Sequence, residues 1–159
     1  CGIMGETQLA GDTPAAFLER AVDFCNETLW GTLNVCVIVH PETRRALGEA
    51  LERAVARLQY GNIVLNHWPA LSFSLGTTPW GAHPGHTRRD IQSGAGFVHN
   101  ARLFERPLKS VLDGPFRMYP EPPWFVTNDA APSLAPALAE FEAAPGPMKL
   151  LGILGASLG

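Results

Sequence analysis

The stretch TLNVCVIVHPETRRALGEALERAVARLQYGNIVLNH (Thr32–His67) decides the fold of this chain. Its first part is a near-continuous apolar run rich in β-branched residues, which is typical of a strand covered on both faces in a parallel sheet. Pro41 then begins a helix that runs to Gln59, and its apolar stripe consists of Ala46, Leu47, Ala50, Leu51, Ala54, Val55 and Leu58. A Tyr-Gly-Asn turn ends this helix, and IVLNH reads as a second buried strand. This order predicts a parallel sheet with right-handed crossovers.

Upstream of this stretch we expect one more strand and one more helix. IMGETQLAG (residues 3–11) reads as a short strand that ends in a Gly-Asp turn. Thr13 is a good N-cap residue, and Pro14 suits the first position of a helix. Apolar residues recur at helical spacing from Phe17 onward, and this helix should stop near Trp30–Gly31.

Downstream of the second buried strand the pattern becomes irregular. A polar and aromatic loop occupies residues 67–96, and TRRDIQSG (87–94) within it is expected to form a short helix. LKSVL (108–112) reads as a short strand, and YPEPPWF (119–125) as an extended connector. The tail over 133–159 should form two short helices separated by a Pro-Gly-Pro break. Because so long a loop inside a compact domain is usually functional, residues 67–96 are the first place to look for a site.

Length, composition and charge describe one globular domain. The chain has 159 residues, of which 46% are hydrophobic and 17% charged, and its net charge is −3. This balance excludes a disordered chain and offers no basic surface for nucleic acid or for a membrane. Cys1, Cys25 and Cys36 are odd in number and have no CxxC spacing, which argues against a disulfide framework and a structural zinc site. We expect Cys25 and Cys36 to be reduced core residues in a cytoplasmic protein.

The loop contains histidines that could bind a metal ion. His67, His83 and His86 are close in sequence and would be the ligands of a small metal-dependent hydrolase. Their spacing matches no catalytic zinc signature, so the competing interpretation is that these imidazoles hydrogen-bond the backbone of the loop. The sequence also has no GxSxG elbow and no glycine-rich phosphate-binding motif.

Aromatic residues of the loop could instead line an apolar pocket. Trp68, Phe73 and Trp80 follow the carboxyl end of a predicted parallel strand, which is where open α/β sheets place their sites. The alternative is that these side chains close the edge of the core.

Several segments, taken in order, resemble the C-terminal portion of the NAD(P)-dependent aldehyde dehydrogenase superfamily. FLERAVDFCNETLWGTL is similar to that family's helix ending in Asn-x-x-aromatic-Gly-Leu, and GNIVLN to its Gly-x-Val/Ile-x-Val/Ile-Asn strand. TPWGAHPG and QSGAG are similar to its Pro-Phe-Gly-Gly-x-Lys-x-Ser-Gly motif, although Ala82 and Pro84 replace the second Gly and the Lys. Ser93 arrives late, after an inserted GHTRRDIQ, which indicates a divergent branch. The matching residues are Asn26, Trp30, Gly31, Gly61, Ile63, Leu65, Asn66, Pro79, Trp80 and Gly81.

This resemblance implies a part of an enzyme that oxidises an aldehyde to a carboxylic acid. It implies that the catalytic thiolate, the general-base Glu and the NAD- or NADP-binding domain precede Cys1 in a longer chain, and that Cys1 is not the nucleophile. The fold implied is a partial three-layer parallel sheet. Residues 1–159 would be inactive alone and would bind no cofactor by themselves. Their partners would be the remainder of the same chain and further copies in a homo-oligomer.

The resemblance also implies roles for individual residues and segments. Residues 1–100 would belong to the catalytic α/β domain, 101–118 to an oligomerisation segment and 119–159 to a connector and helical tail. The wall of the tunnel for a small aldehyde would be formed by Trp80, Trp68, His67, Asn66 and Leu71. The exchanged oligomer strand would consist of Lys109, Ser110, Val111 and Leu112. Two alternatives remain: an ordinary edge strand within one subunit for 109–112, and a stand-alone non-catalytic assembly or regulatory module for the whole chain.

Overall fold

The structure of this chain is a computed structural model that describes residues 2–119, 121, 125 and 127–157. Contacts divide it into two compact units, Cys1–Phe116 and Arg117–Gly159. The first unit is built around a sheet with the strand order β1 (Asn34–Val37), β2 (Asn62–Leu65) and β5 (Ser110–Asp113). Both pairings are parallel, with Asn62 opposite Asn34 on one side and opposite Ser110 on the other. A parallel sheet in a mixed α/β unit is therefore confirmed.

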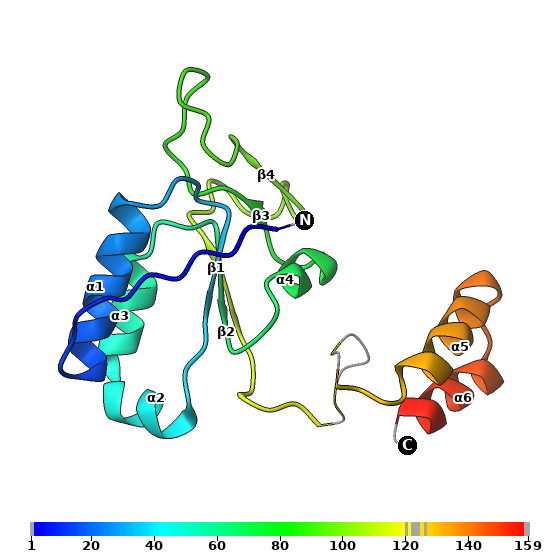
Figure 1. The fold of residues 1–159 in the computed structure, drawn as a ribbon. Helices are drawn as coiled ribbons and strands as arrows, with labels where there is room; N and C mark the ends of the chain where they lie inside the picture. Colours follow the sequence, from blue (N-terminus) through cyan, green and yellow to red (C-terminus); the bar gives the residue numbers. More distant parts are fainter. Residues whose placement is uncertain (1, 120, 122–124, 126, 158–159) are drawn as a thin grey trace. The chain divides into compact units, whose positions relative to one another are not determined.

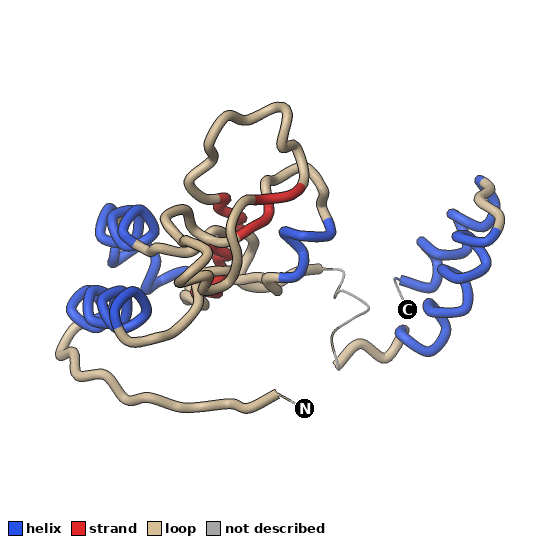
Figure 2. Tube along the Cα trace, turned by 90° about the horizontal axis from the view of Figure 1, so that it is seen from above, coloured by secondary structure: helices blue, strands red, loops and turns tan. Residues whose placement is uncertain are grey.

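Helices lie on both faces of this sheet. Figure 1 shows α1 (Pro14–Glu27) and α3 (Glu49–Arg57) side by side on one face, and the short α4 (Ala70–Ser74) on the other. Figure 2 shows the first unit from above, with the strands between the pair α1 and α3 and the short α4. The predicted start of α1 is confirmed, because the Thr13 hydroxyl accepts a hydrogen bond from the Ala16 amide at 3.2 Å.

One predicted helix is divided in two. The segment after β1 forms α2 (Pro41–Leu47) and then α3, with Gly48 between them at φ 49°. Glycine adopts this left-handed conformation without a steric penalty, so Gly48 can end one helix and start the next. The prediction of a single helix to Gln59 was wrong. The apolar stripe continues from α2 into α3 although the helix axis changes at Gly48, so the stripe does not reveal the break.

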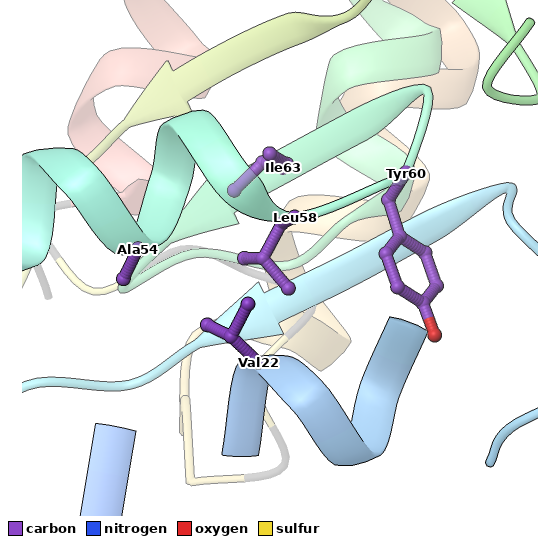
Figure 3. Packing of buried hydrophobic residues seen from close by; sticks show 5 residues of the cluster. All are labelled: Val22, Ala54, Leu58, Tyr60 and Ile63. Carbon is purple, nitrogen blue, oxygen red and sulfur yellow. The ribbon is translucent and has the colours of Figure 1, made fainter. Parts of the chain in front are cut away.

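The core lies between the sheet and the pair α1 and α3. One cluster of buried side chains connects α1, α3 and β2. Its members are Val22, Ala54, Leu58, Tyr60 and Ile63 (Figure 3). The Tyr60 hydroxyl donates to the Cys25 carbonyl at 3.0 Å, which ties this cluster to α1. All four residues of β2 are buried, as expected for a strand in the middle of a parallel sheet.

The first strand is less covered than its apolar sequence predicts. Cys36 of β1 is exposed, and Ile38 just beyond β1 is 77% exposed. The expectation that Cys36 is a core residue was therefore wrong, whereas Cys25 is partly buried. The physical reason is position: β1 is at the end of the described strand order, with a neighbour on one side alone.

The loop after β2 contains elements that its sequence did not predict. Besides α4 it forms β3 (Trp80–Gly81), which pairs antiparallel with β4 (Phe97–Val98). The predicted helix over 87–94 is wrong, because Thr87 and Asp90 exchange two backbone hydrogen bonds and close a tight turn. A hydroxyl and a carboxylate at this spacing favour turns over helix, and no apolar face is available to stabilise a helix there.

The predicted N-terminal strand is absent as well. Residues 2–10 have no regular secondary structure, and the side chains of Ile3 and Met4 are fully exposed. A strand needs a neighbour to satisfy its backbone groups, and no described strand lies beside this segment.

The second unit is a pair of helices, α5 (Ala131–Ala143) and α6 (Pro147–Ser157), that contact each other. The prediction of two short helices separated by a Pro-Gly-Pro break is confirmed. The predicted connector over 119–125 falls largely outside the described residues. Among the described helices, none combines the length and the apolar character required to cross a membrane.

Candidate functional site

The predicted tunnel residues begin where β2 ends. Asn66 adopts a left-handed backbone at φ 55°, and its side-chain oxygen accepts a hydrogen bond from the Val39 amide at 2.7 Å. The next residue, His67, accepts at Nδ1 from the Trp68 amide at 2.8 Å. Since Nδ1 is an acceptor, the ring proton is on Nε2, which is buried and has no hydrogen-bond partner among the described residues. The carboxyl end of β2 therefore holds a buried donor that has no acceptor in the part of the chain that the structure describes.

Trp80 lies at the other end of the same strand. Gly81 next to it accepts a hydrogen bond from the Asn62 side chain at 3.1 Å, so β3 is beside the first residue of β2. Because a parallel strand rises about 3.3 Å per residue, Asn62 and Asn66 are separated by about 13 Å along β2. The structure therefore places four of the five predicted tunnel residues after the carboxyl end of β2 and the fifth, Trp80, beside its amino end.

The short helix α4 connects these two ends. Phe73 of α4 packs edge-on against Trp80, with ring centroids 5.5 Å apart, and also contacts His99 at 4.9 Å. Leu71, another predicted tunnel residue, is partly buried in the same helix. The Thr78 hydroxyl donates to the Ser72 carbonyl at 2.9 Å and holds the turn between α4 and β3. Phe73 thus lies between Trp80 and His99, whereas the sequence offered Phe73 only as a general pocket residue and gave His99 no place in that pocket.

Four sequence motifs meet at Thr32, just before β1. Its carbonyl accepts hydrogen bonds from the amides of Gly61, at 2.9 Å, and His83, at 3.1 Å. Its own amide donates to the Ser93 hydroxyl at 2.8 Å, and its hydroxyl is 2.6 Å from Nε2 of His86. The neighbouring Gly31 amide donates to the side chain of Gln92 at 3.0 Å. The long loop is therefore fastened to the start of the sheet by its histidines and by its QSG segment.

These contacts decide between the two interpretations of the loop histidines. His83 hydrogen-bonds the Pro84 carbonyl through Nδ1, and His86 bonds Thr32. Within the described part of the chain, no three His, Cys, Asp or Glu side chains come close enough to hold a metal ion. The hydrogen bonds of His83 and His86 therefore favour the structural interpretation of these two side chains.

A glycine contact joins two of the motifs directly. A Cβ on Gly61 would lie 1.8 Å from the Gly81 carbonyl oxygen, and a Cβ on Gly81 would lie 2.3 Å from the Gly96 carbonyl oxygen. Such distances are far below van der Waals contact, so both positions require glycine for close backbone approach. Beside this contact, Gly61, the β3–β4 pair and the segment that leads into β5 line an open cavity of about 410 Å³.

The predicted oligomerisation strand is the third strand of the sheet. Ser110–Leu112 pair in parallel with β2, which is the arrangement of an ordinary edge strand within one chain. Lys109, immediately before β5, donates from Nζ to the carbonyl oxygens of Val55, Ala56 and Leu58, at 3.0, 2.7 and 2.7 Å. This ammonium caps the carboxyl end of α3, and burial lowers its pKa. A role of residues 109–112 between subunits stays a prediction.

Neither described thiol is activated. Desolvation raises the pKa of Cys25 and, although the Cys36 side chain as a whole is exposed, also that of the Cys36 thiol. A hydrogen bond from the Cys36 thiol to the His67 carbonyl opposes part of that effect. A catalytic cysteine needs a lowered pKa, so these two residues lack the environment of a nucleophile.

Comparison of the chain with protein-family models, curated proteins and solved structures gave no match.

An ion pair closes the carboxyl end of the sheet and makes stability depend on pH. Arg44 of α2 contacts both carboxylate oxygens of Asp113, at 2.7 and 2.5 Å, and its hydrogen bond lowers the pKa of Asp113. A lowered pKa means that the pair stabilises the fold above the unfolded carboxyl pKa of about 3.9, and that this contribution is lost as pH falls through the folded pKa. Because both side chains are nearly half exposed, the contribution should not exceed about 1 kcal/mol.

We therefore expect Arg44→Gln to lower the free energy of unfolding by up to about 1 kcal/mol near pH 7, and by less as the pH falls below about 4. Urea unfolding at several pH values measures this. Arg45→Gln is the matched control, because Arg45 is in the same helix and has no acidic partner among the described ion pairs. An Arg44→Gln effect that is equal at acidic and neutral pH would contradict the assignment.

Proposed function

We propose that this chain is part of the catalytic domain of an NAD(P)-dependent aldehyde dehydrogenase and supplies a wall of its aldehyde tunnel. The observation that supports this most is the meeting of the motif segments around Thr32. Gly31, Gly61, the backbone next to Trp80 and Ser93 belong to separate motifs, yet hydrogen bonds or close glycine contacts join them. Motifs that belong to one catalytic domain are expected to converge in this way.

The proposed roles follow from how the side chains are held. Trp80, fixed by β3 and by Phe73, would present its ring to an apolar aldehyde and exclude water from it. His67 Nε2 and His99 Nδ1 are buried without partners among the described residues, and such atoms call for a water molecule or a ligand oxygen. Trp68, Asn66 and Leu71 would line the approach from the carboxyl end of β2.

The chemistry itself would be supplied from outside this chain. The described thiols lack the lowered pKa of a nucleophile. The resemblance to the dehydrogenase family implies that the thiolate, the general base and the NAD or NADP site would belong to the remainder of the proposed enzyme. The finer fold that we propose, a three-layer catalytic sheet, would extend from the free side of β1, where Cys36 and Ile38 are exposed. We further propose that the enzyme is a homo-oligomer.

The native polypeptide that carries this sequence provides the test. It would be isolated from its source cells with an antibody raised against the present chain, weighed intact and assayed for NAD(P)H formation with hexanal. We expect a mass well above 17.1 kDa, activity that a thiol reagent abolishes, and no activity of the present chain alone. A native mass near 17.1 kDa, without activity, would reject the proposal in favour of a stand-alone module.

Replacing Trp80 tests the tunnel wall. Trp80→Ala in the native polypeptide should lower kcat/KM for hexanal by about tenfold, the effect of losing roughly 1.4 kcal/mol of apolar contact in the transition state. Trp30→Ala is the matched control, because Trp30 is 74% exposed, lies before β1 and has no proposed place in the tunnel. If both variants keep the kcat/KM of the parent, Trp80 does not line the tunnel.

A further inference from the structure

The cavity beside the Gly61–Gly81 contact is separate from the ring of Trp80. Its walls include Pro79 and Gly81, the neighbours of Trp80, whereas Trp80 is not among the lining residues. A volume of about 410 Å³ is within the range of sites that hold small organic ligands. Most of the lining is apolar, and the side chains that form it are Pro79, Pro84, Phe97, Pro107 and Leu108.

One cation in this lining has no counter-charge. The cavity is lined by Arg106 and Lys109 and by no acidic residue. The ammonium of Lys109 is already engaged by three carbonyl oxygens of the α3 terminus, whereas Arg106 has no ion pair or hydrogen bond among the described residues. Arg106 is also held at φ 50°, a left-handed conformation that is uncommon for arginine. The same residue of the cavity wall therefore has both a strained backbone and a guanidinium without a partner among the described residues.

The shape of the cavity is set by contacts that cannot easily move. Gly61 lies against the Gly81 carbonyl, and Gly81 against the Gly96 carbonyl. The Ser110 hydroxyl donates to the Pro79 carbonyl at 2.8 Å and connects two walls. Three prolines in the lining add stiffness, since each has a fixed φ. A site formed in this way is ready before a ligand arrives, which lowers the entropy cost of binding.

The geometry points to a binding site for a small organic monocarboxylate with an apolar body. The apolar walls would take an aromatic or branched aliphatic group, and the Arg106 guanidinium would receive the carboxylate as a two-point partner. A single free cation suits one negative charge, which favours a carboxylate over a phosphate dianion. This inference does not rest on the proposed dehydrogenase function, because it uses only the cavity and its charge.

Phenylacetate is a suitable probe, with phenylacetamide as its neutral counterpart of nearly the same shape. Backbone amide chemical shifts of the ¹⁵N-labelled chain would be followed while each compound is added. We expect saturable shifts at Gly81, Phe97 and Leu108 with phenylacetate, and binding at least about tenfold weaker with phenylacetamide, because the charged hydrogen bonds are lost.

Variants of Arg106 test whether its guanidinium binds the carboxylate of phenylacetate. Arg106→Gln should weaken phenylacetate binding by about tenfold or more, and Arg106→Lys should restore part of it. Arg102→Gln is the matched control, because Arg102 is exposed in the same segment and does not line the cavity. Equal affinity for the acid and the amide, equal affinity for inorganic phosphate, shifts that map elsewhere, or an unchanged Kd in Arg106→Gln would each overturn the proposal.

Discussion

Gly61→Ala is expected to destabilise this protein by about 3 kcal/mol or more, at the upper end of what overpacking a well-filled site usually costs. The added methyl carbon would lie 1.8 Å from the Gly81 carbonyl oxygen, so one of the two segments must move. Gly61 cannot move, because its amide donates to Thr32 and its carbonyl accepts from Ser110, both at 2.9 Å. Gly81 is held by the Asn62 side chain.

The displacement should therefore fall on β3 and reduce the order around Trp80. Urea unfolding measures the lost stability, and the ¹H–¹⁵N signal of the Trp80 indole measures the changed environment of that ring. Gly5→Ala is the matched control, because its added methyl would meet nothing within 4 Å and should change stability by less than about 0.5 kcal/mol. If the Gly61 and Gly5 variants unfold at the same urea concentration, the close approach of β2 and β3 is wrong.

Lys109→Met is expected to lower the free energy of unfolding by about 2–3 kcal/mol, because three carbonyl oxygens at the end of α3 would lose a charged donor. Methionine keeps an unbranched apolar chain of similar length, so most of the packing would remain. Loss of this link should loosen α3 from β5 and thereby the segment that lines the cavity. Chemical denaturation gives the magnitude, and hydrogen exchange of the α3 amides locates the effect.

Lys149→Met is the matched control for Lys109→Met. Lys149 donates a single exposed hydrogen bond, to the Glu140 carbonyl at 2.9 Å, and its loss should cost less than about 0.5 kcal/mol. Burial lowers the pKa of Lys109, so the folded chain holds this proton less tightly than the unfolded chain. The difference between parent and Lys109→Met should therefore grow as pH rises toward the unfolded lysine pKa of about 10.4. A difference no larger than that of Lys149→Met would show that the cap is not formed.

Local sequence patterns predicted several elements correctly. Thr13 and Pro14 start α1 as their capping chemistry predicts. The buried strand IVL and the two tail helices are present as expected. Errors arose where a neighbour decides the outcome: residues 3–11 have no strand to pair with, and residues 87–94 have no apolar surface to pack against. Secondary structure of such segments depends on tertiary contacts more than on propensity.

The candidate site also has features that the sequence predicted and features that only tertiary contacts determined. The sequence alone determined that aromatic and histidine residues gather in the loop after β2, and that Asn66, His67 and Trp68 follow the carboxyl end of a parallel strand. Only the tertiary structure placed Trp80 at the opposite end of β2 and Phe73 against it. It also assigned His86 to Thr32 and Lys109 to the end of α3. These partners are 54 and 51 residues apart, and no local periodicity encodes which distant backbone will be close once the core between them has packed.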